Sequence, residues 1–284
     1  MEKQTISKVT LTSNEAEEYC AYKRQKKISE IMAALRRSES ELTANDSAVK
    51  LAEQALRLRQ AAVKMSPSEL VSRGGVIRKN GTKVDCIVGG NGETLACVKA
   101  YEAKRVLKAG AREITFILTP SLIVSGRYTE LRKEIKAVRK ATKHIILKAR
   151  VEKNYPQATL ERLVRICSEL GVAYFSFPYF IGCERLQAFA KGGCLLEVSG
   201  INSLPLFKEM AGVGMGRMVV EHAWGLYTEW LKEVEEIAVN REETPALPPP
   251  ENKVKTEENA GEEKPLPLVE NKQTSCRLEE VKCS

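Results

Sequence analysis

Three basic residues stand within or directly after two short apolar runs of this chain, where charged side chains are unusual. Lys64 interrupts the run at 61–66, and Lys148 and Arg150 lie in and after the run at 144–149. If side chains alternate along these runs as they do in strands, Lys64 and Lys148 could point into a shared site. There they could bind an anion, or one amine could form a Schiff base with a carbonyl compound. Alternatively, both could lie at the rim of the fold with their ammonium groups in water.

The elements that would position these residues alternate along the chain. Short apolar runs predict strands, and the amphipathic stretches between them predict helices. The predicted strands are 61–66, 83–88, 113–119, 144–149, 172–177, 194–198 and 213–220, and the predicted helices lie near 93–109, 127–141, 157–170, 183–190, 203–211 and 221–239. An eighth strand is weaker and could lie near 38–43 or near 6–12. The alternation is typical of a parallel α/β fold, but it does not separate a closed barrel from a doubly wound sheet.

The two ends of the chain differ from its middle. Helical patterns cover 14–38 and 46–59, and we divide the chain into an N-terminal helical extension (1–45), an α/β domain (46–240) and a tail (241–284). The tail is rich in Pro, Glu, Lys and Asn and poor in large apolar residues, so we expect it to be disordered. It ends in TSCRLEEVKCS, which could be a frayed end or a peptide that docks onto a larger assembly.

The composition argues against several classes of function. The chain has 45 Lys and Arg against 37 Asp and Glu, a formal charge of +8, but no nucleic-acid-binding motif accompanies this charge. Eight cysteines without a CxxC or Cys/His cluster, and two histidines, argue against a metal site. No apolar run reaches the roughly 20 residues that span a membrane, and no signal peptide is recognisable. We therefore expect a soluble, cytoplasmic protein without nucleic-acid or membrane partners.

Seven segments follow one another between about Ala61 and Val220: AAVKMSPSEL, KVDCIVGGNGETLACVKAYEA, EITFILTPSLIVSGRY, HIILKARVE, VAYFSFPYF, CLLEVSGIN and MAGVGMGRMVV. The first three resemble the second strand and turn, the third strand and helix, and the fourth strand and its loop in the deoxyribose-phosphate aldolase family of class I, Schiff-base aldolases. The last four are similar to strands five to eight of that family. The resemblance implies a (β/α)8 TIM barrel without a cofactor, with its active site at the C-terminal ends of the strands.

The resemblance also implies three catalytic positions. In the family, a lysine on strand six forms the imine, a lysine on strand seven lowers the pKa of that amine, and an aspartate on strand four transfers protons. The corresponding residues here are Ser176, Glu197 and Thr115. Serine cannot form an imine, and a glutamate would raise the pKa of a neighbouring amine. Residues 172–183 contain no lysine, so a shift of one residue does not restore the pattern.

We therefore expect a catalytically degenerate aldolase barrel with a binding, regulatory or assembly role. The alternative is an active or altered aldolase that cleaves a sugar phosphate similar to 2-deoxyribose 5-phosphate. For any retained site we expect a small phosphorylated or anionic ligand at the C-terminal mouth. Its candidate residues are Lys64, Lys148, Arg150, Ser176, Glu197, Ser199 and Gly200. A relocated Schiff-base lysine is disfavoured by Glu197, and the sequence leaves open a protein partner of the tail and a homo-oligomer.

Overall fold

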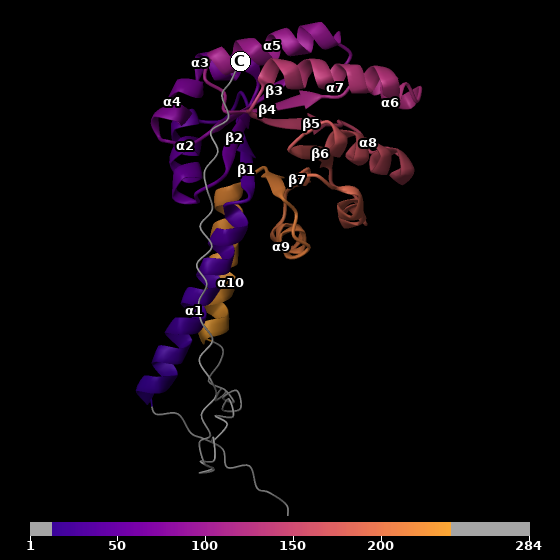
Figure 1. Ribbon diagram of the computed structural model, residues 1–284. Helices are drawn as coiled ribbons and strands as arrows, with labels where there is room; N and C mark the ends of the chain where they lie inside the picture. Colours follow the sequence, from indigo (N-terminus) through magenta and orange to yellow (C-terminus); the bar gives the residue numbers. More distant parts are fainter. Residues whose placement is uncertain (1–12, 240–284) are drawn as a thin grey trace, which may run out of the picture. The chain divides into compact units, whose positions relative to one another are not determined.

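A computed structural model describes residues 13–239 of the chain (Figure 1). Its sheet consists of eight parallel strands that pair in sequence order, and β8 pairs with β1 to close a barrel. The strands are β1 (Ser38–Glu41), β2 (Ala62–Met65), β3 (Val84–Val88), β4 (Glu113–Ile117), β5 (Ile146–Arg150), β6 (Tyr174–Pro178), β7 (Leu195–Ile201) and β8 (Arg217–Val220). The predicted TIM barrel is thus confirmed, and the doubly wound sheet is ruled out.

Helices connect successive strands and cover the outside of the barrel. They are α1 (Ser13–Leu35), α2 (Ala48–Arg57), α3 (Pro67–Ser72), α4 (Gly74–Lys79), α5 (Ala96–Lys108), α6 (Pro120–Val124), α7 (Tyr128–Thr142), α8 (Gln157–Glu169), the 3-10 helix η1 (Cys183–Phe189), α9 (Leu204–Gly212) and α10 (Ala223–Val239). The long helices match the amphipathic stretches of the sequence. The short helices α3, α4 and α6 were not predicted, because five or six residues are too few to show a helical period.

The first barrel strand is Ser38–Glu41, which pairs with β2 on one side and β8 on the other. The barrel therefore starts inside the 1–45 segment that we expected to be an extension. The alternative strand at 6–12, the predicted disordered tail and its terminal peptide all lie outside the described residues. Of the extension, α1 lies along α10 (Figure 1) and is joined to it by an ion pair of 3.0 Å between Arg24 Nη2 and Glu235 Oε1.

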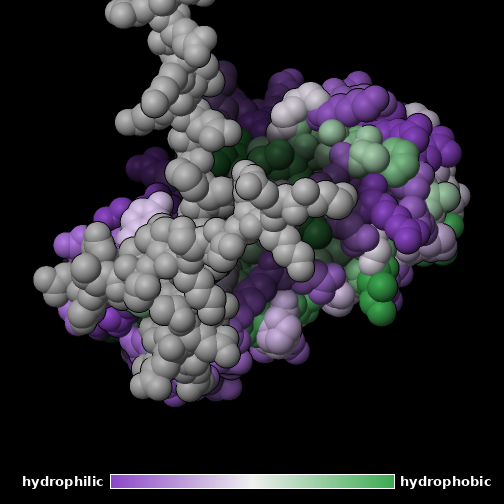
Figure 2. Space-filling view, turned by 90° about the horizontal axis from the view of Figure 1, so that it is seen from below, coloured by the Kyte–Doolittle hydropathy of each residue, from purple (hydrophilic) through white to green (hydrophobic). Residues whose placement is uncertain are grey.

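Alternation along each strand divides the buried residues into two sets. Outward-facing side chains such as Val63, Ile114 and Phe175 are fully buried beneath the helices and are apolar. The face of the molecule seen from below is largely hydrophilic where the described residues are visible, with apolar patches between (Figure 2). The apolar core is therefore the layer between the sheet and its helices, and the inner set of side chains is a separate environment. No helix within residues 13–239 is long and apolar enough to cross a membrane.

Candidate functional site

The interior of the barrel is filled by side chains that the strand register arranges in three layers of four, as is usual for this fold. The middle layer comes from the odd-numbered strands and consists of Glu39, Asp85, Lys148 and Glu197. The layer towards the C-terminal mouth comes from the even-numbered strands and consists of Lys64, Thr115, Ser176 and Val219. The layer towards the opposite end consists of Ala62, Glu113, Tyr174 and Arg217. Seven of these twelve side chains are ionisable as acids or strong bases, where such barrels usually place branched apolar residues.

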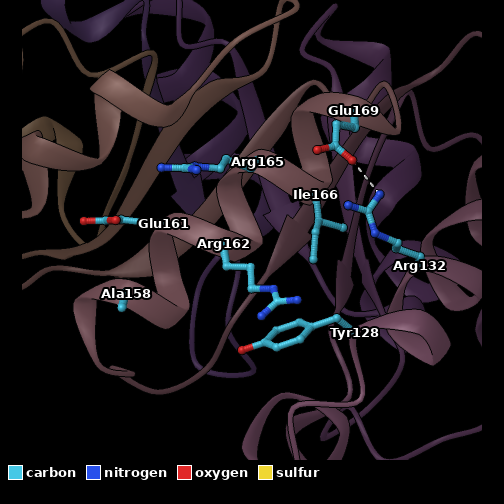
Figure 3. A pocket seen from close by; sticks show the side chains of 8 residues that line it. All are labelled: Tyr128, Arg132, Ala158, Glu161, Arg162, Arg165, Ile166 and Glu169. Carbon is cyan, nitrogen blue, oxygen red and sulfur yellow. Dashed lines mark ion pairs between the residues drawn. The ribbon is translucent and has the colours of Figure 1, made fainter.

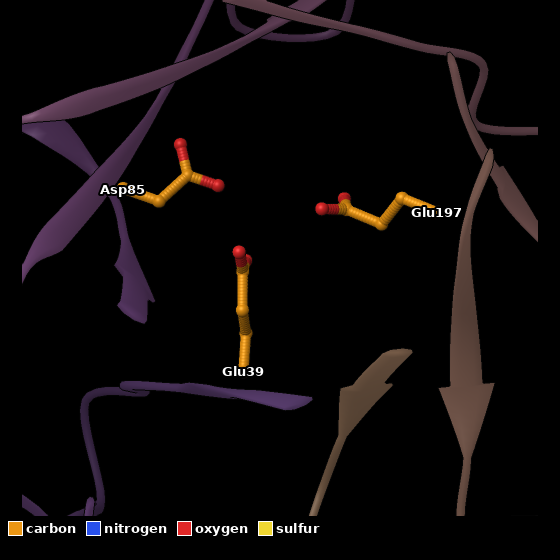
Figure 4. Close-up of side chains that lie close together, drawn as sticks. All are labelled: Glu39, Asp85 and Glu197. Atoms are coloured by element: carbon orange, nitrogen blue, oxygen red, sulfur yellow. The ribbon is translucent and has the colours of Figure 1, made fainter. Parts of the chain in front are cut away.

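Two lysine ammonium groups each contact the same three carboxylates. Lys64 Nζ lies 2.6 Å from Glu197 Oε1, 3.1 Å from Asp85 Oδ2 and 3.5 Å from Glu39 Oε2. Lys148 Nζ lies 2.8 Å from Glu197 Oε2 and 3.0 Å from Asp85 Oδ2, and it also contacts Glu39 Oε1. All five side chains have 0% exposure. Figure 4 shows the three carboxylates converging from their separate strands on this common centre. We call these five residues the ionic cluster.

Arg217 and Glu113 extend the ionic cluster towards the N-terminal end of the strands. Arg217 Nη1 lies 2.8 Å from Glu39 Oε1, and Glu113 Oε2 lies 3.1 Å from Lys148 Nζ. The guanidinium of Arg217 also stacks on the ring of Tyr174, at 4.9 Å from its centroid. The ionic interactions therefore continue from the middle layer into the layer below it.

Two hydroxyl groups complete the ionic cluster on the side of the mouth. Thr115 Oγ1 donates to Asp85 Oδ2 at 2.7 Å, and Ser176 Oγ donates to Glu197 Oε1 at 2.7 Å. Thr115 Oγ1 also accepts a hydrogen bond from Lys64 Nζ at 3.2 Å. The three residues at the implied catalytic positions, Thr115, Ser176 and Glu197, are therefore brought together, and their contacts are with the ionic cluster.

The carboxylates keep both lysines protonated. Burial alone would lower the pKa of Lys64, but the negative charges of Glu197 and Asp85 outweigh burial and raise this pKa above its ordinary value. The same competition holds the pKa of Lys148 well above its ordinary value, with Asp85 and Glu197 as the main opposing charges. Only a neutral amine attacks a carbonyl. Neither lysine is therefore poised as a Schiff-base nucleophile.

The carboxylates of the ionic cluster differ from one another. Burial would raise the pKa of Glu197, but Lys148 and Lys64 overcome it and lower this pKa to about 2. The pKa of Asp85 is likewise held well below its usual range by Lys148 and Lys64, against the effect of burial. For Glu39 burial prevails over Lys148, and the pKa is raised to about 7. Glu39 is thus the member of the cluster whose charge changes near neutral pH.

The three converging carboxylates have the donor types of a divalent-cation site, with an oxygen of each within 4.8 Å of the others. The two ammonium groups already occupy the space that these oxygens surround, because each contacts all three. A metal ion bound there would lie next to two positive charges. The residues present therefore do not fit a metal, and the ammonium groups serve as the counter-ions.

The remaining candidate residues lie towards the C-terminal mouth. Arg150 forms an ion pair of 2.7 Å with Glu152, and its side chain is 14% exposed. The hydroxyl of Ser199 donates to the carbonyl of Phe177 at 3.3 Å, and Gly200 is exposed. Lys64 and Lys148 are not at a solvated rim, because the alternation of β2 and β5 turns both inward. An anion site at the mouth stays a prediction. Lys64 and Lys148 could bind an anion there only if they gave up their contacts in the ionic cluster.

Four charged members of the interior were missed from the sequence: Glu39, Asp85, Glu113 and Arg217. The strand register aligns each of them with inward-facing residues of the neighbouring strands. A charge inside an otherwise apolar run, as at Asp85 in KVDCIV, was the available signal.

A third buried lysine ties together two loops at the C-terminal side of the barrel. Lys99 on α5 has 0% exposure, and its Nζ donates to Glu134 Oε1 at 2.6 Å, to the Ile117 carbonyl at 2.8 Å and to Thr119 Oγ1 at 2.9 Å. Thr119 Oγ1 in turn donates to the carbonyl of Gly92 at 3.0 Å. Burial lowers the pKa of Lys99 in spite of Glu134. These contacts fix the segments that follow β3 and β4, and they explain why a charged residue can be buried beneath α7.

No protein-family model matches the chain. Curated relatives do match it. The chain is 29% identical over 144 residues to a deoxyribose-phosphate aldolase of Histophilus somni, an alignment that covers 49% of this chain and 58% of that protein. It is 28% identical over 190 residues to a deoxyribose-phosphate aldolase of Clostridium botulinum, covering 66% of this chain and 81% of that protein. The chain thus spans little more than half the length of the first of these relatives.

Solved structures agree on the fold. The structure of QR15, described as an aldolase, has a TM-score of 0.64 and 22% identity, covering 72% of this chain and 98% of that one. A deoxyribose phosphate aldolase from Aeropyrum pernix, described as having a unique tetrameric structure, has a TM-score of 0.61 and 19% identity, covering 78% of this chain and 98% of that one. Together with the relatives named above and the closed eight-stranded barrel, these likenesses show that the chain is similar to deoxyribose-phosphate aldolases in sequence and in fold.

Proposed function

We propose that this chain is a catalytically degenerate aldolase barrel that acts in binding, regulation or assembly. One observation carries the proposal: Lys64 and Lys148 are fully buried, and each ammonium group contacts the same three carboxylates. A Schiff-base aldolase depresses the pKa of its nucleophilic amine by burial and a nearby cation. In this interior the negative charge of the three carboxylates raises the pKa of both lysine amines instead of lowering it.

The route from substrate to amine supports the same proposal. An aldehyde would have to enter a layer in which Lys64 and Lys148 have no exposed surface, and an amine would have to give up its carboxylate contacts. Removing one member of such a buried network leaves uncompensated charge, which typically costs about 3–5 kcal/mol. That cost would be added to the free energy needed to deprotonate the amine. Both costs argue against rapid imine formation in the closed barrel.

The alternative proposal is an active or altered aldolase. It is favoured by the names of the curated relatives, which are deoxyribose-phosphate aldolases. A substrate similar to 2-deoxyribose 5-phosphate would then be cleaved at the C-terminal mouth, with Lys64 or Lys148 as the imine-forming residue after rearrangement of the ionic cluster. The two proposals differ in whether a covalent amine adduct forms.

Borohydride trapping separates them. The chain is incubated with 2-deoxyribose 5-phosphate or acetaldehyde, reduced with borohydride, digested and analysed by mass spectrometry. We expect no substrate-dependent adduct on Lys64 or Lys148, while an authentic deoxyribose-phosphate aldolase treated in parallel is labelled. Exposed Lys104 is the internal control for slow, unspecific reductive alkylation. A substrate-dependent adduct on Lys64 or Lys148 that exceeds the labelling of Lys104 would overturn the degenerate barrel in favour of the aldolase.

The binding or assembly role concerns the tail and the surface. We propose that residues 241–284 tether the barrel to a protein partner in the cytoplasm, and that the barrel itself can associate with further copies. Removal of the residues after Asn240 should leave the thermal unfolding of the barrel unchanged and alter the set of co-purified proteins. An unchanged set would discard the tether. Sedimentation of the full chain tests self-association independently.

A further inference from the structure

Two hollows lie on the outside of the barrel, one on each side of α8. The first, of about 360 Å³, lies between α7 and α8 (Figure 3), and the second, of about 420 Å³, lies between α8 and the segment from η1 to Lys191. Arg165 and Glu169 line both hollows. The surface of α8 is therefore a ridge between two adjoining depressions, which a single extended segment could cross.

Each hollow contains an arginine held against an aromatic ring. In Figure 3 the guanidinium of Arg162 lies beside the ring of Tyr128. The distance from this guanidinium to the centroid of the Tyr128 ring is 4.0 Å, and the guanidinium of Arg165 lies 4.8 Å from the centroid of the Phe189 ring. Stacking fixes the plane of a guanidinium and leaves its N–H edge available for a bidentate contact. No ion pair or side-chain hydrogen bond engages either guanidinium within the described part of the chain. Both arginines are exposed and oriented, and no side chain among residues 13–239 uses their hydrogen-bonding capacity.

The other charges of the two hollows leave a positive excess. Glu169 is already paired with Arg132, at 2.6 Å between Oε2 and Nη1, and Glu161 accepts a hydrogen bond from Gln157 at 3.0 Å. Lys191 adds a further exposed positive charge to the second hollow. The ligand chemistry that matches two oriented guanidinium groups is a pair of carboxylates, because each can accept two parallel N–H bonds.

We propose that this surface, the α8 arginine ridge (Arg162, Arg165 and Lys191), docks the acidic tail of the chain, residues 241–284. The tail contains ten acidic and seven basic residues, and eight of the ten glutamates stand in four adjacent pairs: Glu242-Glu243, Glu257-Glu258, Glu262-Glu263 and Glu279-Glu280. Adjacent side chains of an extended segment point to opposite sides. A pair laid across α8 can thus place one carboxylate in each hollow.

The tether makes this docking feasible although each contact is weak. Exposed ion pairs contribute little individually and are screened by salt. A flexible chain with as many residues as the tail spans on the order of 35 Å on average, and a short flexible tether raises the local concentration of its end to the millimolar range. The four pairs can also exchange at the ridge, so that docking remains reversible. We expect binding that is populated at low salt and lost at high salt.

The test compares charge reversals in the full-length chain by ¹⁵N TROSY spectra. In the wild-type protein at low salt, the amides of the glutamate pairs should be displaced from the positions they take at high salt. Arg162→Glu/Arg165→Glu should abolish this displacement. Lys104→Glu/Lys108→Glu, which reverses two exposed charges on α5, is the matched control with the same net charge and should retain it. Thermal unfolding establishes that both variants are folded.

A second variant changes the ligand instead of the barrel. Replacing the eight paired glutamates of the tail by glutamine leaves every described residue of the barrel as it is, and it should remove the salt-dependent shift of the Arg162 and Arg165 Nε signals. A displacement that survives Arg162→Glu/Arg165→Glu, or that the α5 control abolishes equally, would overturn the proposal. Unchanged arginine signals after the glutamine replacement would also overturn it. Dependence of the shifts on protein concentration tells whether the tail docks on its own barrel or on a neighbouring copy; either result supports the site.

Discussion

Lys148 Nζ and Glu197 Oε2 lie 2.8 Å apart inside the barrel, on strands separated by β6, and neither side chain has exposed surface. The family resemblance implies a lysine at position 197, where a positive charge would lower the pKa of a neighbouring amine. The glutamate present raises the pKa of both lysines, and Lys148 and Lys64 in turn overcome burial and lower the pKa of Glu197 to about 2. One residue therefore reverses the electrostatic effect of this strand position on the centre of the barrel.

Replacing Glu197 by glutamine should destabilise the barrel strongly. Glu197 contacts Lys64, Lys148 and Ser176, and its removal leaves two buried ammonium groups with one anion fewer. We expect a loss of about 3–5 kcal/mol in the free energy of unfolding, measured by urea denaturation at neutral pH. Glu53→Gln, an exposed position on α2, is the matched control and should change stability by no more than about 0.5 kcal/mol. Equal effects of the two substitutions would mean that the lysines do not depend on Glu197.

Stability should fall as pH rises from about 4.5 towards about 7, and Glu39 should cause this fall. Its pKa is raised from 4.5 to about 7 in the folded barrel, chiefly by burial. Within that window the folded state keeps a proton that the unfolded state has lost, so stability decreases with increasing pH. Below this window, the lowered pKa of Glu197 has the opposite effect, and stability is lost as pH falls towards about 2.

The variant Glu39→Gln isolates this contribution, because glutamine resembles the protonated carboxyl at every pH. We expect the free energy of unfolding of Glu39→Gln to change less between pH 5 and pH 8 than that of the wild type. Urea denaturation across this range measures the difference. A wild-type profile that rises over the same window, or a variant with the same slope, would show that Glu39 is ionised throughout.

Most of the fold could be predicted from the sequence because strands and helices are recognised from patterns among neighbouring residues. Apolar runs and amphipathic periods placed seven strands to within a few residues, and the weak strand was placed at 38–43 or 6–12. SESE has no apolar pattern, since Glu39 and Glu41 both face the interior side of β1 and Ser38 and Ser40 the outer side. The register that closes the barrel depends on pairing with β8, which no local pattern encodes.

The site could be predicted only in part. The sequence identified Thr115, Ser176, Glu197, Lys64 and Lys148, and the structure brings all five into contact. It did not identify Asp85, which together with Glu197 outweighs the effect of burial on the pKa of both lysines, or Glu39, which also raises both pKa values. That outcome depends on distances across the barrel between residues far apart in the chain. Burial and the positions of partner charges are properties of the closed fold, so the pKa shifts could not be inferred from the sequence alone.

The cluster around Lys99 should behave as a coupled buried pair. Lys99→Met removes the donor to Glu134, the Ile117 carbonyl and Thr119, and it leaves the Glu134 carboxylate buried without its cation. We expect a loss of about 3–5 kcal/mol in the free energy of unfolding. The double variant Lys99→Met/Glu134→Leu removes both charges and should be more stable than Lys99→Met alone. If the second substitution adds a further loss of similar size, the two residues act independently and the pair is not coupled.

Alanine at Gly92 should reduce the free energy of unfolding more than alanine at its near neighbour Gly90. Both glycines have positive φ, +89° and +55°, so alanine at either position is strained by about 1–2 kcal/mol. A Cβ on Gly92 would also meet Ile117 Cγ2, the Leu118 carbonyl and Pro120 Cδ at 2.8 Å, while a Cβ on Gly90 has nothing within 4 Å. Crowding of this kind adds about 1–3 kcal/mol, so Gly92→Ala should cost clearly more than Gly90→Ala in urea denaturation. The difference measures how tightly the turn after β3 packs against the end of β4. Equal costs of the two substitutions would mean that the turn can shift enough to relieve this crowding. The Lys99 contacts would then restrain the turn, and the packing of Gly92 would not.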